Sequence, residues 1–160
     1  MKALELNSDF KTALDLIEKE GRNLFITGRA GTGKSTLLQL FRNTTRKKAV
    51  VLAPTGVAAL NVRGQTIHSF FGFPPRLISP LEISKRKDRR LYRNMEVLVI
   101  DEISMVRADV LDNIDYFLRL NRDSPLPFGG VQVVFFGDLF QLPPVVATDF
   151  EQEVFSTTYD

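Results

Sequence analysis

Four stretches of the chain are apolar and lack the polar alternation of a half-exposed strand. They are 23–27 (NLFIT), 49–53 (AVVLA), 97–101 (VLVID) and 131–138 (VQVVFFGD). Such runs are typical of strands in a parallel sheet that helices cover on both faces. A weaker strand is predicted beyond Pro144. The pattern therefore predicts a mostly parallel sheet.

Apolar residues at helical spacing occupy the intervals between these runs. The predicted helices are 34–43, 56–64, 83–94 and 107–120, preceded by an amphipathic helix with its N-cap at Asn7 or Ser8. The predicted loops are 71–80, 121–130 and the tail from Asp149, where neither a helix nor a strand is expected. Strands that alternate with helices predict a doubly wound α/β domain, which binds ligands at the carboxyl ends of its strands.

Length and composition narrow the class of protein. A chain of 160 residues with 44% hydrophobic and 25% charged residues is typical of one globular domain. No apolar run is long enough to cross a bilayer and the N-terminus lacks the features of a secretory signal, so no membrane partner is expected. The absence of cysteine excludes disulfides and thiolate metal sites and favours an intracellular protein.

Residues 28–36 read GRAGTGKST and match the pattern G-x-x-x-x-G-K-[ST] between a predicted strand and a predicted helix. Inward-pointing backbone N–H groups and the start of the helix would cradle phosphate oxygens. Lys34 would reach the β- and γ-phosphates, and the Ser35 hydroxyl would occupy one position around Mg²⁺. The alternative is a glycine-rich turn with no ligand. The flanking strand and helix favour the phosphate-binding interpretation, and we call residues 28–36 the phosphate loop.

Asp101 and Glu102 follow the third apolar run, where a buried strand delivers side chains to the ligand edge of the sheet. Asp101 is the natural partner of Mg²⁺, and Glu102 can take a proton from an attacking water, as a nucleotide hydrolase requires. A guanine-reading Asn-Lys-x-Asp sequence is not supplied by the stretch NRDS at 121–124, so ATP is the favoured nucleotide. An acidic turn without a metal is the alternative for the pair.

The formal charge of +2 hides an uneven distribution. Residues 85–93 (KRKDRRLYR) contain six basic residues and one acidic residue. Such a cluster is either a nucleic-acid contact or the solvated face of a surface helix, and charge alone does not separate these two interpretations.

Three further stretches carry a resemblance to a known family. They are 53–75 (APTGVAALNVRGQTIHSFFGFPP), 101–120 (DEISMVRADVLDNIDYFLRL) and 127–145 (PFGGVQVVFFGDLFQLPPV). Together with the phosphate loop they resemble superfamily 1 DNA helicases of the Pif type (petite integration frequency), which are related to RecD. The resemblance covers about residues 20–148 and implies a RecA-like P-loop NTPase fold.

The resemblance also implies roles for individual residues. Phosphate and metal contacts fall to the phosphate loop, which supplies Gly28, Gly31, Thr32, Gly33, Lys34, Ser35 and Thr36. Asp101 and Glu102 would hold the metal and activate water, and Gln141 would sense the γ-phosphate. An uncharged amide that both donates and accepts hydrogen bonds suits the task of Gln141.

Contacts to single-stranded DNA are implied for two segments. Pro54, Thr55 and Gly56 resemble a loop that touches the DNA backbone, and His68 and Phe70 belong to the next DNA-contacting segment. Small and hydroxyl residues allow close approach to phosphates, and aromatic rings can stack on bases. A packed or capping role remains the alternative for His68. For Phe70, and for Phe71 and Phe73 beside it, the alternative is a place in the core.

The chain departs from the family in two respects. Phe10 stands where these enzymes usually carry a glutamine that reads adenine, and no second RecA-like domain follows Val145. We therefore predict one RecA-like domain over 1–160, the N-terminal motor domain of a longer, monomeric, intracellular 5′-to-3′ DNA helicase, located in the cytoplasm or nucleoid if bacterial. Alone it would bind ATP and Mg²⁺ with little hydrolysis and no unwinding. The alternatives are a stand-alone P-loop ATPase or transferase and an ATP-gated DNA-docking module.

Overall fold

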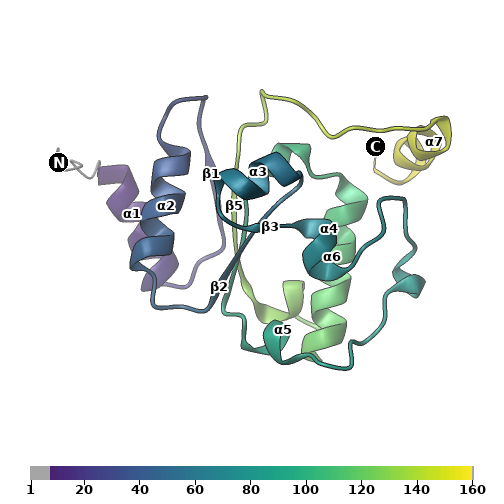
Figure 1. Cartoon of the computed structure of the whole chain (residues 1–160), viewed down its shortest axis with the longest axis horizontal. Helices are drawn as coiled ribbons and strands as arrows, with labels where there is room; N and C mark the ends of the chain where they lie inside the picture. The colour runs from purple at the N-terminus through teal and green to yellow at the C-terminus, as the bar shows by residue number, and fades with distance from the viewer. Residues whose placement is uncertain (1–7, 160) are drawn as a thin grey trace.

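The computed structural model describes residues 8–159, which form a parallel sheet of five strands in the order β1-β5-β4-β2-β3 (Figure 1). The strands are β1 (Leu24–Thr27), β2 (Ala49–Ala53), β3 (Gln65–Thr66), β4 (Val97–Ile100) and β5 (Gln132–Gly137). The four longer strands lie within the four apolar runs, which confirms those predictions.

The sheet is covered on both faces, which confirms the doubly wound α/β arrangement. The helices α1 (Ser8–Glu18), α2 (Lys34–Thr44) and α3 (Gly56–Asn61) contribute to one apolar core. The helices α4 (Ile67–Phe71), α5 (Arg90–Asn94) and α6 (Ala108–Arg122) contribute to the other. Strand β4 shows the reason, because Val97 and Val99 enter the first core whereas Leu98 and Ile100 enter the second.

The second core is rich in aromatic rings. Phe71 stacks on Phe73 at 5.4 Å between ring centroids and meets Phe117 of α6 edge to face at 5.1 Å. Tyr92 of α5 lies 4.8 Å from the Phe117 ring and donates a hydrogen bond to the Phe70 carbonyl. Edge-to-face pairs of this kind add to the stabilisation from burial, so the segment 67–73 is anchored to α6.

The structure corrects two predicted elements, a strand that does not form and a helix that is shorter than predicted. The weak strand beyond Pro144 does not form, and the fifth strand is β3, which pairs Gln65 with Leu52 and Thr66 with Ala53. The predicted helix 83–94 is reduced to α5, because the preceding residues use their polar groups elsewhere. For example, the Arg86 backbone N–H donates to the Asn121 side chain at 2.8 Å.

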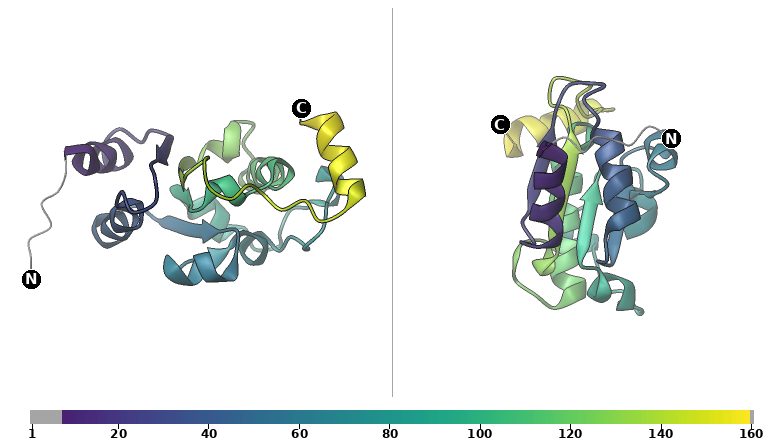
Figure 2. Two further views of the ribbon diagram at one scale, coloured as in Figure 1. Left: turned by 90° about the horizontal axis from the view of Figure 1, so that it is seen from above. Right: turned by 90° about the vertical axis from the view of Figure 1, so that its left-hand side faces the viewer.

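The tail from Asp149 is not a loop but the helix α7 (Asp149–Thr158). Its start is a capping box, in which the Thr148 hydroxyl accepts from the Glu151 backbone N–H and the Glu151 carboxylate accepts from the Thr148 backbone N–H. Helices α1 and α7 lie at opposite ends of the long axis (Figure 2). The predicted N-cap at Asn7 lies outside the described residues, and Ser8 is the first helical residue.

Within residues 8–159, none of the helices is both long enough and apolar enough to cross a membrane.

Candidate functional site

The phosphate loop connects β1 to α2 and turns sharply at two glycines. Gly31 has φ 80° and Gly33 has φ 94°, values that side chains with a Cβ rarely adopt. Gly28 is needed for a different reason, since a Cβ there would lie 2.6 Å from the Thr32 hydroxyl oxygen. That hydroxyl donates to the Arg29 carbonyl at 2.8 Å. The conformation of the loop therefore depends on the absence of a Cβ atom at these three glycines.

Lys34 begins α2 and folds back over the loop. Its ammonium group donates to the carbonyl of Gly28 and, at 3.1 Å, to that of Arg29. Ser35 and Thr36 lie in the first turn of the same helix and are exposed. A lysine held by two neutral carbonyls can exchange them for a more negatively charged group, as a phosphate ligand would supply.

Phe10 of α1 packs against the loop at Gly33. A Cβ on Gly33 would lie 2.7 Å from the Cζ atom of the Phe10 ring. The contact places Phe10 beside the phosphate loop, and its ring offers no hydrogen-bonding group to a nucleotide base.

The acidic pair follows β4, and the strand register aligns it with the phosphate loop at the carboxyl edge of the sheet. Thr27 pairs with Gly137 and Ile100 pairs with Phe135, so the chain leaves β1, β5 and β4 at the same edge. Glu102 has φ 53°, a left-handed conformation that is strained for a residue with a long side chain. Such strain is often found at functional sites.

A pocket of about 290 Å³ is lined by the predicted metal ligands Ser35 and Asp101 and by Glu102. Burial raises the pKa of the Asp101 carboxyl, the charge of Glu102 adds to this effect, and Lys34 opposes it. A bound cation would stabilise the ionised form that burial disfavours. No cluster of three or more His, Asp or Glu side chains able to hold a metal occurs in residues 8–159. A hydroxyl and a carboxylate nevertheless suit Mg²⁺, which takes few protein ligands and also binds substrate phosphates.

Gln141 lies on an exposed segment between β5 and α7. The buried Asp138 fixes the beginning of this segment, because its carboxylate accepts from the Phe140 backbone N–H at 3.0 Å and its carbonyl accepts from the Gln141 backbone N–H at 3.0 Å. Exposed apolar side chains flank the glutamine, and Phe140 is 98% exposed. The structure presents Gln141 at the surface next to an apolar ribbon, which we define as Leu139, Phe140, Leu142, Val145 and Val146.

The residues expected to contact DNA lie at the end of β2 and in α4. The Thr55 hydroxyl accepts from the Ala58 backbone N–H at 3.2 Å and caps α3, which leaves its own proton free for another acceptor. Gly56 faces open space, since a Cβ there would meet no atom within 4 Å.

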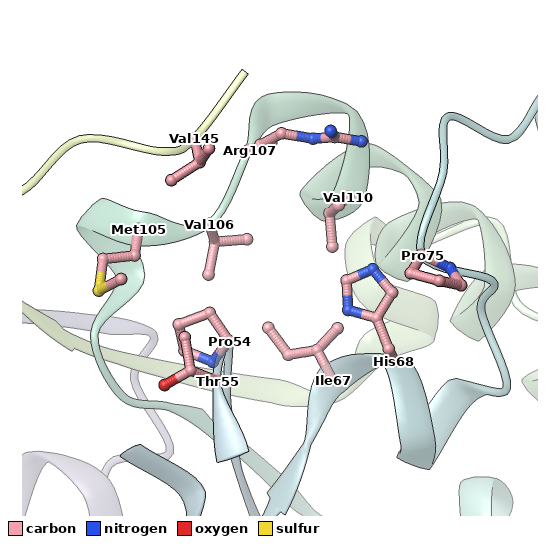
Figure 3. Close-up of a pocket in the computed structure, with 10 residues that line it drawn as sticks. All are labelled: Pro54, Thr55, Ile67, His68, Pro75, Met105, Val106, Arg107, Val110 and Val145. Carbon is pink, nitrogen blue, oxygen red and sulfur yellow. The ribbon is translucent and has the colours of Figure 1, made fainter. Parts of the chain in front are cut away.

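His68 and Thr55 line a second pocket, which has a volume of about 270 Å³ (Figure 3). Its walls are mostly apolar, with Pro54 and Ile67 on one side and Val145 and Arg107 opposite (Figure 3). Burial lowers the pKa of His68, the charge of Arg107 lowers it further and Asp109 opposes the effect. His68 is therefore a neutral hydrogen-bonding group at neutral pH.

The expectation that Phe70 stacks on a base is corrected. Phe70 is 9% exposed, and its ring meets Phe71 and Tyr92 edge to face at 4.9 and 5.5 Å. Phe71 and Phe73 are buried as well. The aromatic segment turns inward because α6 presents Phe117 to it.

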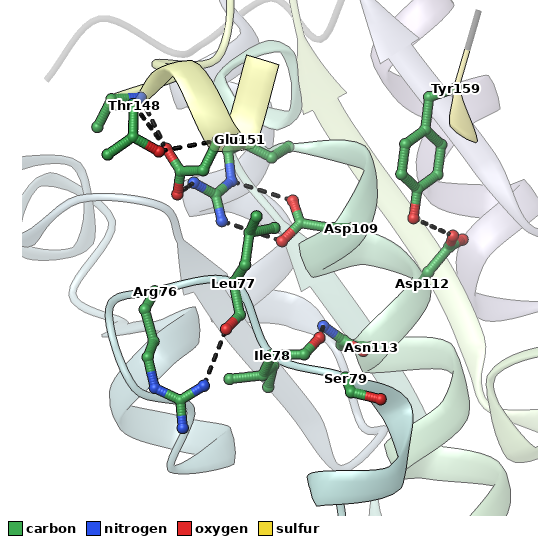
Figure 4. Close-up of polar contacts among 12 residues, drawn as sticks. Arg76, Leu77, Ile78, Ser79, Asp109, Asp112, Asn113, Thr148, Glu151 and Tyr159 are labelled. Atoms are coloured by element: carbon green, nitrogen blue, oxygen red, sulfur yellow. Dashed lines mark hydrogen bonds and ion pairs between the residues drawn. The ribbon is translucent and has the colours of Figure 1, made fainter. Parts of the chain in front are cut away.

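An ion-pair cluster beside the second pocket was not found from the sequence (Figure 4). Arg107 donates to Asp109 at 3.0 Å and to Glu151 of α7 at 2.7 Å, and its guanidinium lies over the Phe155 ring at 5.5 Å. Tyr159 donates to Asp112 of α6 at 2.7 Å. The spacing T-x-x-E of Thr148 and Glu151 is that of a capping box and could have predicted the start of α7. Nothing in the sequence pairs Glu151 with Arg107.

The sequence of the chain is similar to those of known helicases. A sequence model described as PIF1-like helicase matches residues 5–159. The ATP-dependent DNA helicase PIF1 of Saccharomyces cerevisiae is 42% identical over 151 residues, which cover 88% of this chain and 17% of that protein. The ATP-dependent DNA helicase Pif1 of Bdellovibrio bacteriovorus is 41% identical over 151 residues, which cover 91% of this chain and 34% of that protein.

Solved structures agree with the sequence matches. Bacteroides Pif1 bound to ssDNA superposes with a TM-score of 0.88 and 46% identity, over 99% of this chain and 37% of that one. Pif1 helicase from Bacteroides in complex with ADP-AlF3 and ssDNA gives a TM-score of 0.89 and 46% identity, over 99% and 38%. The chain thus spans well under half the length of the relatives it matches.

Proposed function

The chain belongs to the PIF1-like helicase family, and we propose that it is the ATP-binding motor domain of a longer ATP-dependent helicase that moves 5′ to 3′ on single-stranded DNA. The observation that carries the proposal is the pocket that Ser35, from the phosphate loop, lines together with Asp101 and Glu102. The compartment that holds the cell's DNA would be its place of action, and a monomer would be its working form.

ATP would bind with its phosphates on the phosphate loop. Lys34 would leave the carbonyls of Gly28 and Arg29 for the β- and γ-phosphates. Mg²⁺ held by Ser35 and Asp101 would neutralise phosphate charge, and Glu102 would accept the proton of the attacking water. The adenine-reading glutamine is replaced by Phe10, so weak discrimination among nucleotide bases is expected.

Single-stranded DNA would run across the second pocket. The Thr55 hydroxyl can donate to a phosphate oxygen, and neutral His68 can donate to a phosphate or a base edge. Two solved relatives, Bacteroides Pif1 and Pif1 helicase from Bacteroides with ADP-AlF3, are in complex with ssDNA. Phe70 has no place in this contact, because it is buried.

A second RecA-like domain of the full-length protein would pack against the apolar ribbon around Gln141. Phe140 at 98%, Val145 at 72% and Leu142 at 71% exposure are unusual for one contiguous segment of a monomeric domain, and they indicate a surface that is covered in the working protein. Closure of that domain over ATP would bring Gln141 to the γ-phosphate and supply the arginine that accelerates transfer by about 10³- to 10⁵-fold in comparable enzymes.

The first experiment measures nucleotide binding and hydrolysis. A fluorescent ATP analogue should bind the chain in the presence of Mg²⁺, and Lys34→Ala should weaken binding at least about 100-fold without changing the circular dichroism spectrum. Hydrolysis by 1–160 should stay near background with and without oligo-dT. A form extended past Asp160 should hydrolyse ATP in response to oligo-dT. If the extended form hydrolyses ATP at the same rate with and without oligo-dT, the result would instead support a stand-alone ATPase.

The second experiment tests the DNA contact. Fluorescence anisotropy of labelled oligo-dT should show binding that the double variant Thr55→Val/His68→Ala weakens about tenfold or more. The matched control is Ser69→Ala, which alters an exposed neighbour of His68 and should bind normally. Equal binding by all three proteins would contradict the DNA contact at this pocket.

A further inference from the structure

All strands of a parallel sheet begin at one edge, and in this protein the segments that enter β2, β4 and β5 are joined there by backbone hydrogen bonds. Glu96 donates to the Lys48 carbonyl at 2.9 Å, and Gln132 donates to the Glu96 carbonyl at 3.3 Å. Residues 46–48 and α5 therefore lie close together, at the edge opposite the phosphate loop. We call residues 46–48, 85–93 and 122–123 the amino edge.

The amino edge carries a large surplus of positive charge. Residues 46–48 (RKK) are all basic, and residues 85–93 contain six basic residues and only Asp88 as an acid. The whole chain has a net charge of only +2, so the rest of the molecule is acidic. The two basic segments are far apart in sequence, and only the fold places them side by side.

Asp123 shows how far this surplus exceeds the available carboxylates. Lys85 donates to Asp123 at 2.5 Å and Arg89 at 2.8 Å, and Arg93 also donates to it. Hydrogen bonds from Lys85 and Arg93 hold the pKa of Asp123 well below its usual range. Three cations that share one carboxylate leave positive charge for a further anion, because each cation is only partly compensated.

Three other cations of the amino edge have no partner in the part of the chain that the structure describes. The side chains of Arg46, Lys48 and Lys87 are exposed and make no ion pair or hydrogen bond with any residue between 8 and 159. No carboxylate among residues 8–159 pairs with these charges, so they are available to an external anion.

Open grooves extend the amino edge on both sides of Lys47. One, of about 620 Å³, is lined by Lys47, Arg93 and Arg122. The other, of about 560 Å³, is lined by Arg42, Lys47 and Arg63. Arg42, Arg63 and Arg93 are exposed cations in the lining of these grooves, and Glu96 is an acid that lines the larger one. The grooves thus give the amino edge a recessed, mainly basic surface, which an elongated polyanion could follow.

We propose that the amino edge is a second DNA-binding surface, which holds the phosphodiester backbone at the side of the sheet opposite Thr55 and His68. The inference rests on the proposed function in one respect, that DNA is the partner. Lys and Arg side chains contact phosphates without regard to sequence, and each contact releases a counterion. Binding here is therefore sequence-independent and salt-sensitive. An acidic protein segment would be the competing occupant.

The test is anisotropy of the chain with labelled dT₂₀ and with a 20-base-pair duplex, from 50 to 200 mM salt. The double variant Lys48→Gln/Lys87→Gln removes two unpartnered charges and should bind about three- to tenfold more weakly at 50 mM salt. Its plot of log K against log salt should become shallower by about 0.7 for each lost contact on single strands, or about 0.9 on duplex. The DNA form that shows the change is the one this surface binds.

Two controls separate a local site from a general charge effect. Lys11→Gln removes one exposed positive charge from the start of α1, next to Phe10 and the phosphate loop at the opposite edge of the sheet. It should leave affinity within twofold, unlike Lys87→Gln alone. Asp123→Asn should strengthen binding, since it frees three cations, and asparagine tolerates the φ of 51° at that position. A loss of affinity on Asp123→Asn would overturn the proposal.

Failure of this inference can be told from failure of the proposed function. If Thr55→Val/His68→Ala weakens binding and Lys48→Gln/Lys87→Gln does not, the second surface is refuted and the first stands. If a labelled acidic peptide binds the native chain and loses affinity for Lys48→Gln/Lys87→Gln, while dT₂₀ and the duplex bind both proteins equally, the surface takes an acidic protein segment and its assignment to DNA is refuted.

Discussion

At the carboxyl edge of the sheet, Lys34, Asp101 and Glu102 form no ion pair with any described residue, whereas at the amino edge Asp123 pairs with three cations. The first edge is shaped by backbone: glycines with positive φ and a strained Glu102. The second is held by side chains: Arg122, for example, donates to the carbonyls of Tyr92, Arg93, Met95 and Gly129. At the carboxyl edge the charged side chains have no partner of opposite charge among the described residues, whereas at the amino edge buried contacts such as those of Arg122 stabilise the fold beside cations that remain open to an anion. Substitutions at the carboxyl edge should therefore affect activity, and substitution of Arg122 should affect stability.

The largest effect is expected for Glu102→Gln at the carboxyl edge. In a form extended past Asp160, DNA-stimulated hydrolysis should fall about 10²- to 10⁴-fold, because the amide cannot accept the proton of the attacking water. Binding of ATP and the melting temperature should change little, since Glu102 has no ion pair to lose. Steady-state phosphate release and a fluorescent ATP titration measure the two quantities. A variant that hydrolyses normally would remove Glu102 from the mechanism.

Arg122→Met at the amino edge should have the opposite outcome, a loss of stability without a loss of nucleotide binding. It removes a guanidinium that donates to four carbonyls at the ends of α5 and of the 3-10 turn Pro127–Gly130, and it should lower the free energy of unfolding by roughly 2–4 kcal/mol. Nucleotide affinity at temperatures where the protein is folded should not change. Urea titration supplies the stability, and Arg119→Met is the milder control, because Arg119 pairs with Asp115 of the same helix and donates to only one carbonyl, that of Pro125. Equal losses for both would show that the carbonyl contacts are not what matters.

Gly33→Ala should have a smaller effect on stability and a clear effect on binding. The backbone at φ 94° would be strained by about 1–2 kcal/mol, and the new methyl would meet the Phe10 ring at 2.7 Å. We expect a matching loss in the free energy of unfolding and at least a tenfold loss of ATP affinity. The double variant Phe10→Ala/Gly33→Ala removes the contact but not the strain. The double variant should therefore lose less free energy of unfolding than the sum of the losses of Phe10→Ala and Gly33→Ala.

The smallest effect is local and concerns α7. Hydrogen bonds from the Ala147 backbone and from Arg107 lower the pKa of Glu151. A lowered pKa in the folded state means that the ionised carboxylate stabilises the docked helix. This contribution is complete above a pH of about 5 and is lost as the pH falls through the lowered value. Amide chemical shifts of α7 followed from pH 7 to pH 3 should show undocking in acid. In Glu151→Gln the helix should be less firmly docked at pH 7 and show no acid step of its own.

The sequence predicted the elements whose signal is local. The central strand β4 was visible because a strand buried on both faces is apolar throughout, as in VLVI at 97–100. Strand β1 was equally visible as an apolar run, although alternate residues of it are exposed. The phosphate loop was visible because glycines at fixed spacing are needed for its turns. Helix α7 was missed although Thr148 and Glu151 stand at capping-box spacing, because its amphipathic pattern is weak.

The predictions that Phe70 stacks on a base and that residues 83–89 are helical were wrong for another reason. An aromatic residue in a polar segment can face DNA or the core, and the choice depended on Phe71, Tyr92 and Phe117 from distant parts of the chain. Residues 83–89 have helical spacing, but Asn121 and Asp123 of another element offered their polar groups better partners. Tertiary contacts of this kind outweigh a modest helix propensity.

The sequence by itself determined the strands, the phosphate loop and the residues able to do its chemistry, because each depends on near neighbours along the chain. Only the tertiary structure decided that Ser35 meets Asp101 in one pocket, that Arg107 holds Glu151, and that residues 46–48 join 85–93 in one basic surface. Pairings between distant residues follow from strand order and register, which no local pattern encodes. The amino edge is the clearest case, since charge was evident from the sequence and its arrangement was not.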